Sequence, residues 1–463
     1  MSTTVFALAT PAGRSGVAII RISGPASGEV LRRMTKRDLP QARVASRRKF
    51  YADTPVDPSP RPSPPEEDGC GEQSLRPQQV IDDGLVLWFP GPASFTGEDM
   101  AELHVHGGPA VLAAISESLV AHGLQPAEPG AFTRRAFDNC KLDLTEVEGL
   151  ADLIAAETEA QRRQALRQME GGFGVQVERW RGGLLGSLAR IEAAIDFPEE
   201  DLPSGLIEGV DEAMRAIDNE IARMLDDDHR GERLREGLST VILGAPNAGK
   251  SSLMNALAKR DVAIVSDEAG TTRDVIELQL DLGGYPVLLA DTAGLRESGN
   301  KIETEGVRRA LARAARADVK VIVLDGAVWP GIPDSIGAQI DAASILVLNK
   351  ADLLPAPLQT VSGHQPIVVS ALTGAGLSDL LAALKERAAG LLASGDQAVL
   401  TRLRHRDALE NCRQALTRGL EMGPVELKAE EFRLAIRALG RITGRVNVED
   451  VLDLIFREFC IGK

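Results

Sequence analysis

Cysteine and aromatic residues are scarce in this chain of 463 residues. The four cysteines are Cys70, Cys140, Cys412 and Cys460, and no two of them form a C-x-x-C pair. This spacing argues against a zinc knuckle or a dithiol redox site and fits reduced thiols in the cytosol. Aromatic residues make up 3% of the chain, so base stacking is not expected to dominate any binding to single-stranded nucleic acid.

Long apolar runs and an excess of positive charge are also missing. No run is apolar for long enough to span a bilayer, and residues 1–16 lack the basic and apolar regions of a secretory signal. Segment 460–463 ends in lysine, which does not fit a prenylation motif. With 52 basic and 67 acidic residues the net charge is −15, which excludes coating of nucleic acid by bulk charge. We therefore expect a cytoplasmic protein that does not contact a membrane.

The length of the chain alone predicts about three domains. Changes in the spacing of hydrophobic residues show where the chain divides. Residues 1–139 begin with strand-like runs and predict a small α/β domain, within which residues 51–79 are rich in proline and charge and predict a mobile surface insertion. Helical periods cover 140–236 and return over 387–463, whereas short apolar strands alternate with helices over 237–386. These patterns predict an α/β plus all-α protein, in which an α/β domain with a parallel sheet interrupts a discontinuous helical domain.

The expected elements follow from the same patterns. We expect strands at 5–9, 17–22, 85–89, 100–105, 240–243, 287–290, 319–324, 345–348 and 367–369. We expect helices at 110–119, 144–169, 180–195, 210–225, 252–257 and 448–459.

A glycine-rich segment, GAPNAGKS at 244–251, matches the G-x-x-x-x-G-K-[ST] pattern. It follows the strand at 240–243 and opens the helix at 252–257, which argues against a plain glycine-rich turn. The glycines let backbone N–H groups converge on phosphate oxygens, and the helix N-terminus favours negative charge. Lys250 can supply charge to the β- and γ-phosphates, and Ser251 can bind Mg²⁺. The segment therefore predicts a phosphate site.

Two later segments would complete this phosphate site. The DTAG segment at 291–294 follows an apolar run, so that Asp291 can hold Mg²⁺ through water and Gly294 can approach the γ-phosphate. Thr272 lies between the two elements and can bind Mg²⁺ only when a γ-phosphate is present, which predicts a switch loop. Many loops contain a D-x-x-G pattern, so this pattern alone is weak evidence for a nucleotide site. Its position directly after an apolar strand strengthens that evidence.

The choice of base is expected to depend on NKAD at 349–352, which follows the strand at 345–348. The Asp352 carboxylate can accept hydrogen bonds from the N1–H and the exocyclic amine of guanine. Adenine offers neither donor there and would leave the carboxylate unpaired. Residues 370–372 (SAL) match the loop whose N–H groups contact the guanine O6. Together these segments predict a Ras-like P-loop GTPase domain.

The expected GTP-binding residues lie in these segments and, for Ser266 and Thr271, in the stretch that precedes Thr272. They are Asn247, Ala248, Gly249, Lys250, Ser251, Ser252, Ser266, Thr271, Thr272, Asp291, Thr292, Ala293, Gly294, Asn349, Lys350, Asp352, Ser370, Ala371 and Leu372.

Two positions distinguish this GTPase from Ras-like proteins. Leu295 follows DTAG where Ras-like proteins carry a glutamine that orients water, so another group must do this work. The amide of Asn247 could hold a monovalent cation beside the phosphates, where an arginine finger otherwise stabilises charge. An Asx turn that stabilises the loop explains Asn247 equally well.

The combination of GAPNAGKSS, VSDEAGTTRD, DTAGLRES and NKAD resembles the MnmE (TrmE) tRNA modification GTPases, of the TrmE-Era-EngA-like superfamily. The C-terminal FCIGK, the N-terminal GVAIIRISG, FTGED and ELH, and KLDL at 141–144 resemble that family as well. The resemblance covers nearly the whole chain. The proline-rich insertion departs from it, as do Ser266 and Glu268, where threonine and an aliphatic residue are expected.

This resemblance implies cofactors and partners that spacing alone does not show. The N-terminal domain would bind a reduced folate, 5-formyl- or methylene-tetrahydrofolate, and would form a homodimer. The G domains would pair across the dimer in a K⁺-dependent manner. The partner would be the flavoprotein MnmG (GidA), and together the two proteins would add a carboxymethylaminomethyl or aminomethyl-type group at C5 of the wobble uridine U34 of certain tRNAs.

The resemblance also implies residue roles. Ser251 and Thr272 would hold Mg²⁺, and K⁺ would be surrounded by Asn247, Ser266, Glu268 and Thr271. The folate pocket would be lined by Arg21, Glu102, Lys141 and Lys463. Glu303 would be the catalytic carboxylate, although a glutamate at a helix start is also common because it suits the helix dipole.

Some alternatives stay open. Strand alternation places Glu102, His104 and His106 on one face, which allows a metal site but favours a half-buried polar or folate-binding face. Cys460 is either reactive or a small residue that packs the C-terminus. A ribosome-assembly or RNA-binding regulatory GTPase would share the guanine motifs, but no KH-type GxxG pattern appears outside the G domain. A folate-dependent one-carbon transferase regulated by the GTPase is the third reading.

Overall fold

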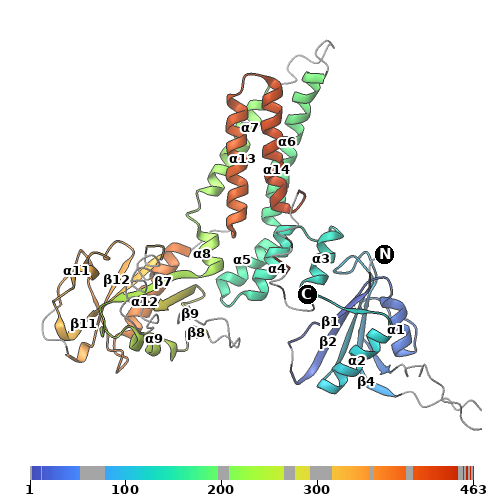
Figure 1. Ribbon diagram of the computed structural model, residues 1–463, viewed down its shortest axis with the longest axis horizontal. Coiled ribbons are helices and arrows are strands. Elements are labelled where there is room, and N and C mark those ends of the chain that lie inside the picture. The colour runs from blue at the N-terminus through green and yellow to red at the C-terminus, as the bar shows by residue number, and fades with distance from the viewer. Residues whose placement is uncertain are drawn as a thin grey trace, which may run out of the picture. The chain divides into compact units, whose positions relative to one another are not determined.

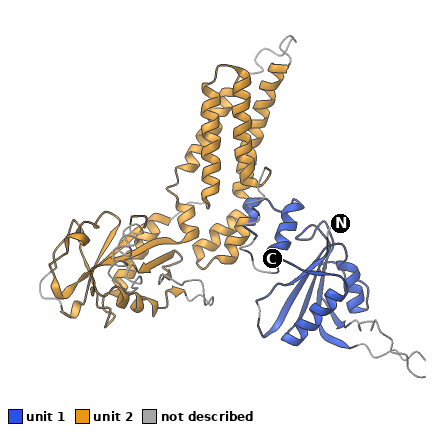
Figure 2. Ribbon diagram, in the orientation of Figure 1, with its two compact units in different colours: residues 1–147, 447–463 blue, residues 148–446 orange. Residues whose placement is uncertain are grey.

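The computed structural model describes residues 3–11, 13–52, 79–196, 208–264, 277–291, 315–353, 358–392 and 400–446, with Leu452, Ile455, Phe456, Phe459 and Gly462. The chain forms two compact units, residues 1–147 with 447–463 and residues 148–446 (Figure 2). Within the described ranges, no helix combines the length and the apolar character needed to cross a bilayer.

The first unit contains a six-stranded sheet with the order β3-β4-β5-β2-β1-β6 (Figure 1). Neighbouring strands are antiparallel, except that β1 and β6 are parallel. The strands are β1 (Val5–Leu8), β2 (Ser15–Ser23), β3 (Ser46–Tyr51), β4 (Val80–Phe89), β5 (Met100–Gly107) and β6 (Gln125–Pro126). The helices are α1 (Ser27–Thr35), α2 (Pro109–Ala121) and α3 (Ala131–Asp138). The expected strands at 5–9, 17–22, 85–89 and 100–105 and the helix at 110–119 are confirmed.

Strand β3 is not predicted from the sequence, because half of its residues are charged and only Phe50 is buried. It lies at the edge of the sheet. Such a pattern is typical of an edge that resists pairing with another chain. Most of the proline-rich insertion, residues 53–78, lies outside the described residues.

One face of this sheet carries the core of the first unit. Alternate residues such as Ile20, Ile22 and Leu103 are buried, and Ile115 and Leu119 of α2 belong to the same hydrophobic cluster. Because successive side chains of a strand point to opposite faces, the residues between them lie on the other face. That opposite face is where the candidate folate residues of β2 and β5 are found.

The second unit contains a bundle of long helices, which Figure 1 shows as α6, α7, α13 and α14 side by side. The helices of this part are α4 (Leu144–Ala155), which begins before the boundary of the unit, α5 (Glu159–Met169), α6 (Gly172–Asp196), α7 (Val210–Leu225), α8 (Arg230–Glu236), α13 (Leu403–Glu421) and α14 (Val425–Thr443). The helix expected at 210–225 is confirmed as α7.

The continuous helix expected at 144–169 is wrong. The chain leaves the helix after Ala155, and Thr158 caps a new helix. The Thr158 hydroxyl accepts from the Gln161 N–H, and the Gln161 side chain accepts from the Thr158 N–H. This reciprocal capping box stabilises a helix start, which the hydrophobic period does not register.

The bundle core explains one of the cysteines. Cys412 of α13 is buried among apolar side chains such as Leu409, Leu416 and Phe432. Burial, with a smaller effect of Asp218, raises the pKa of the Cys412 thiol to about 12. The thiol is therefore protonated at neutral pH and behaves as a small apolar side chain.

The second unit also contains a seven-stranded sheet with the order β13-β12-β11-β7-β10-β9-β8. Its strands are β7 (Leu238–Gly244), β8 (Ala263–Ile264), β9 (Glu277–Asp281), β10 (Pro286–Asp291), β11 (Val319–Asp325), β12 (Ser344–Asn349) and β13 (Ile367–Val368). Its helical elements are α9 (Lys250–Ala258), η1 (Gly326–Val328), α11 (Asp334–Gly337), η2 (Ala351–Leu353) and α12 (Leu377–Leu392). The expected strand positions in this domain are confirmed.

Strands β7 and β10 to β13 are parallel, whereas β8 and β9 form an antiparallel edge. Ile242 belongs to the core on one face of β7, and Val241 and Leu243 belong to the core on the other. Burial on both faces accounts for the continuous apolar runs of these strands. Strand β7 lies between β10 and β11, so the strand order reverses there, and a crevice at the carboxyl ends of the strands is the expected ligand site.

The chain enters the seven-stranded sheet after α8 and returns to the helical bundle at α13. At each of these two connections an arginine pairs with a carboxylate of α4. Asp152 binds Arg235, the last arginine before β7, at 3.0 Å. Glu148 accepts two hydrogen bonds from Arg404, which follows α12 in the chain, and lies 2.8 Å from His405 Nε2.

Glu148 and His405 are buried, which strengthens the interaction between them, whereas Asp152, Arg235 and Arg404 are partly exposed. Burial alone would raise the pKa of the Glu148 carboxyl, but His405 and Arg404 outweigh it and hold that pKa below its ordinary value. Burial lowers the pKa of His405. Arg404, which stays protonated, supplies the permanent counter-charge of the Glu148 carboxylate.

Candidate functional site

The glycine-rich segment lies between β7 and α9, in the strand–loop–helix context that a phosphate loop requires. Gly244 and Gly249 have positive φ angles of 157° and 93°. A Cβ atom on Gly244 would lie 2.4 Å from the Val323 carbonyl oxygen, and one on Gly249 would lie 2.1 Å from Asn349 Nδ2. Only glycine fits at these positions, because both the backbone conformation and the space exclude a side chain.

The lysine of this loop folds back over it. Lys250 Nζ donates to the carbonyl oxygens of Gly244 and Ala245 at 2.9 and 3.1 Å. Its ammonium group therefore lies at the mouth of the loop, where phosphate oxygens would meet the backbone N–H groups at the start of α9.

A serine and an aspartate from two neighbouring elements meet beside the loop. Ser251 Oγ donates to Asp291 Oδ2 at 2.9 Å, and Asp291 is 3% exposed at the end of β10. A hydroxyl and a buried carboxylate are the hard oxygen donors that Mg²⁺ prefers. The residues present therefore fit a magnesium ion held by Ser251 directly and by Asp291 through water.

Asn349, at the end of β12, joins three loops. Its Nδ2 donates to the Ala248 carbonyl at 2.9 Å, and its Oδ1 accepts from the Ala371 N–H at 3.0 Å. The side chain is 2% exposed, so these bonds are shielded from water. Asn349 thus aligns the phosphate loop with the two segments expected to contact the base.

The base segments also contact one another. Ser370 Oγ donates to Asp352 Oδ1 at 3.0 Å, which orients the carboxylate while leaving its other oxygen available. Lys350 Nζ lies 2.6 Å from Asp325 Oδ2. Burial alone would raise the pKa of Asp325, but Lys350 and the Ala327 N–H reverse this and lower it. Asp325 is absent from the sequence prediction, although an aspartate directly after the apolar run at 319–324 was a usable signal.

The structure therefore brings together the expected residues of the phosphate loop (Asn247 to Ser252), Asp291, the 349–352 loop and the 370–372 loop. Leu372 is 87% exposed at the edge of this group. The remaining expected residues of this site lie outside the described residues: Ser266, Glu268, Thr271, Thr272, Thr292, Ala293, Gly294 and Glu303.

Asn247 is exposed and has a φ angle of 64°, a left-handed conformation that asparagine tolerates better than most residues. This conformation suits a loop-stabilising role and a cation-binding role equally.

In the first unit, the structure pairs two of the candidate folate residues. Arg21 Nη2 and Nε bind Glu102 Oε1 at 2.9 and 3.1 Å, on directly opposed positions of β2 and β5. Arg21 Nη1 also donates to the Gly462 carbonyl at 3.3 Å, so residues near the C-terminus lie on this face. Lys141 is exposed, with its Cγ 3.4 Å from where a Cβ on Gly97 would be, and Lys463 lies outside the described residues.

The metal interpretation of the E-x-H-x-H pattern finds no support. Glu102 and His104 do lie on one face of β5, 3.5 Å apart, but His106 bonds Asp82 at 2.8 Å instead. Among the residues that the structure describes, no group of three or more His, Cys, Asp or Glu side chains could hold a metal ion. The half-buried polar face is the better description.

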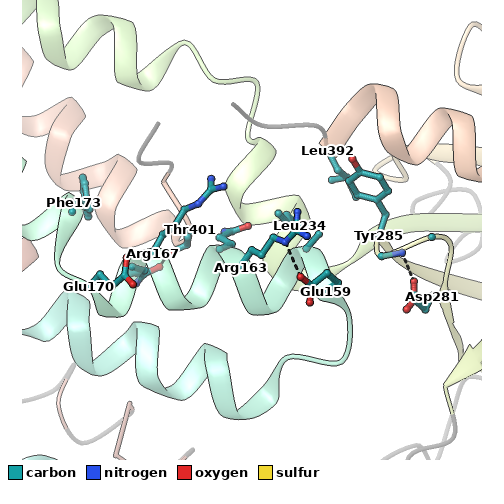
Figure 3. A pocket seen from close by; sticks show the side chains of 16 residues that line it. Glu159, Arg163, Arg167, Glu170, Phe173, Leu234, Asp281, Tyr285, Leu392 and Thr401 are labelled. Carbon is teal, nitrogen blue, oxygen red and sulfur yellow. Dashed lines mark hydrogen bonds and ion pairs between the residues drawn. The ribbon is translucent and has the colours of Figure 1, made fainter. Parts of the chain in front are cut away.

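A separate cavity of about 680 Å³ lies between α5 and the turn that joins β9 to β10 (Figure 3). Glu159 and Arg163 of α5 form an ion pair at 2.7 Å on its wall, and Asp281 accepts from the Gly284 N–H at 2.6 Å on the opposite side. None of the candidate nucleotide residues lines it. The sequence gives no sign of this cavity, because it forms between segments more than a hundred residues apart.

Comparison with known sequences identifies the family. The sequence model described as the MnmE helical domain matches residues 144–460, and the one described as the GTP-binding protein TrmE N-terminus matches residues 4–141. The chain belongs to the MnmE family.

Curated MnmE-family relatives match along the whole chain. Proteins named tRNA modification GTPase MnmE are 51% identical in Paramagnetospirillum magneticum, over 100% of both chains, and 53% identical in Rhodospirillum rubrum, over 99% of both. A human mitochondrial protein, 5-taurinomethyluridine-[tRNA] synthase subunit GTPB3, is 47% identical over 99% of this chain and 93% of its own length. This MnmE-family chain is a GTP hydrolase, and the converging loops of its second unit are the candidate nucleotide site.

Proposed function

We propose that this GTPase modifies tRNA: acting with the flavoprotein MnmG (GidA) in the cytoplasm, it supports addition of a carboxymethylaminomethyl or aminomethyl-type group at C5 of the wobble uridine U34. The observation that carries the proposal is similarity over the full length to relatives named for tRNA modification. The name of the human relative refers to a tRNA uridine that is substituted at position 5. This name supports the proposal that the present chain also acts on position 5 of a uridine.

The proposed domain organisation assigns these tasks to separate segments. Residues 1–139 bind folate and form the homodimer, residues 140–236 and 387–463 make the helical domain, and residues 237–386 form the G domain. GTP is bound by the loops that Asn349 aligns, and Mg²⁺ is held by Ser251 and Thr272.

A nucleoside assay of tRNA tests the function. In cells that lack the chain, mass spectrometry of tRNA nucleosides is expected to show loss of the C5-modified wobble uridine. In vitro, the chain with MnmG and GTP is expected to restore it when methylene-tetrahydrofolate is supplied as the one-carbon donor together with an amine donor. Modification by the chain alone would favour a folate-dependent transferase. Normal tRNA together with defective ribosomal particles would instead favour a ribosome-assembly GTPase.

Hydrolysis of GTP is expected to depend on K⁺ through pairing of the G domains. We expect turnover in K⁺ to exceed that in Na⁺ by about 10-fold or more at equal ionic strength, because a bound cation would stabilise transition-state charge. The proposed K⁺ ligands are Asn247, Ser266, Glu268 and Thr271. Equal rates in the two salts would contradict the proposal.

The variant Asn247→Gly separates the two interpretations of this asparagine. Glycine accepts the positive φ angle at this position but has no amide oxygen. If Asn247 binds K⁺, the variant loses the preference for K⁺ over Na⁺. If Asn247 only stabilises the loop, the preference remains while the nucleotide affinity changes.

A reduced folate, 5-formyl- or methylene-tetrahydrofolate, is expected to bind the polar face of the first unit. A guanidinium, a carboxylate and a backbone carbonyl meet there at Arg21, Glu102 and Gly462, a donor and acceptor set that fits a pterin edge or a glutamate tail. Lys141 and Lys463 are proposed to complete the pocket.

We expect Glu102→Ala to weaken binding of 5-formyltetrahydrofolate by about 10-fold or more, since charged hydrogen bonds are lost, as measured by calorimetry on the dimer. Asp83→Ala is the matched control. It removes a similar carboxylate–arginine pair, Asp83 with Arg47 at 2.9 Å, from the edge of the same sheet. Folate binding that is unaltered in Glu102→Ala, or lost equally in the control, would contradict this assignment.

A further inference from the structure

Two adjacent residues at the end of β11 support the loop expected to hold the base. Asp325 and Asn349 are directly opposed in the parallel pair of β11 and β12. Gly326, the residue directly after β11, approaches the same loop: a Cβ on Gly326 would lie 2.5 Å from the Asn349 carbonyl oxygen and 2.9 Å from that of Lys350. The backbone at 325–326 therefore lies in direct contact with the start of the base loop.

Lys350 has a left-handed backbone conformation, which residues other than glycine seldom adopt. Its φ angle is 62°, and such conformations persist where the surrounding structure enforces them. Its ammonium group binds Asp325 Oδ2 at 2.6 Å. Asp325 Oδ1 in turn accepts from the Ala327 N–H at 3.0 Å, so the carboxylate is itself oriented by the short helix η1.

We propose that Asp325 is a positioning residue of the guanine site, which holds Lys350 and with it the 349–352 loop in the conformation that presents Asp352 to the base. This inference rests on the proposed assignment of that loop to guanine. It extends the site to a residue outside the guanine-binding motif. Asp325 acts through its ion pair with Lys350, so its effect is expected on nucleotide retention rather than on the chemical step.

The experiment measures dissociation of a fluorescent GDP analogue from the full-length protein. We expect Asp325→Ala to raise the dissociation rate by about 10-fold, with kcat at saturating GTP changed by less than about twofold, because a charged hydrogen bond to the loop is lost. Asp325→Asn keeps an acceptor for the Ala327 N–H and removes the charge, and is expected to shift the rate in the same direction. It provides a test if the alanine variant folds poorly.

Asp341→Ala is a matched control, because Asp341 lies in the turn before β12 and pairs with a lysine of β11. Asp341 binds Lys320 Nζ at 2.6 Å, the same distance, at the opposite end of β11. We expect this variant to keep the wild-type dissociation rate. An equal rise in the control would overturn the proposal, since loss of any such pair would then explain the effect.

A double-mutant cycle shows whether Asp325 acts through Lys350. We expect Lys350→Ala to speed dissociation and the double variant with Asp325→Ala to be no faster than the faster single variant. Additive effects, or a wild-type rate in Asp325→Ala, would overturn the positioning role of Asp325 and leave the guanine assignment intact. A wild-type rate in Lys350→Ala, with unchanged GTP affinity in Asp352→Asn, would overturn the guanine assignment as well.

Discussion

Replacement of Asp352 by asparagine is expected to lower the affinity for GTP by at least about 100-fold, since two hydrogen bonds to a carboxylate are lost. The asparagine amide would face the N1–H and the exocyclic amine of guanine with a donor of its own. It would instead match the carbonyl oxygen that xanthine carries in place of the amine, so the affinity for XTP is expected to rise. Ser370 Oγ, 3.0 Å from Asp352 Oδ1, can bond either side chain and keep it oriented.

Competition binding with GTP, XTP and ATP measures this change. Asp379→Asn, an exposed acidic residue in the first turn of α12, serves as the control and is expected to bind GTP normally. Unchanged GTP affinity in Asp352→Asn would contradict the assignment of the 349–352 loop to guanine binding. Restoration of tRNA modification by XTP in this variant would show that nucleotide turnover supports the modification.

Glu303→Ala is expected to lower kcat for GTP hydrolysis by roughly 100-fold or more, the usual contribution of a positioned acid or base. Leu295 has no hydrogen-bonding group, so a carboxylate further along the sequence is the proposed group that orients water. Glu303 lies outside the described residues, and its assignment rests on the sequence and on the family. Nucleotide affinity and K⁺-dependent pairing are expected to survive the substitution.

The neighbouring carboxylates provide the comparison for Glu303. Single-turnover rates of Glu297→Ala and Glu305→Ala are expected to stay near wild type. If one of them abolishes turnover while Glu303→Ala does not, the role moves to that residue. If all of these variants retain turnover, no carboxylate of this segment orients the water.

The sequence determined those features that depend on neighbouring residues. The phosphate loop is recognisable as a local pattern, because its glycines adopt positive φ angles and the helix start follows within a few residues. The contacts with Val323 and Asn349 that also exclude a side chain at 244 and 249 come from the tertiary structure. The alternation of buried strands and helices over 237–386 likewise predicted a parallel sheet, since such strands are apolar on both faces. The helix break before Thr158 was missed because hydrophobic periodicity does not register a capping box.

The tertiary structure alone decided which distant side chains meet. Asn349 bonds Ala248, a hundred and one residues away, and Glu148 meets His405 across two hundred and fifty-seven residues. Asp325 meets Lys350 only through the register of β11 against β12. Motifs specify the chemistry that a segment can perform, whereas strand order and burial select partners without regard to separation along the chain. The nucleotide motifs were therefore readable from the sequence, and the residues that hold them in place were not.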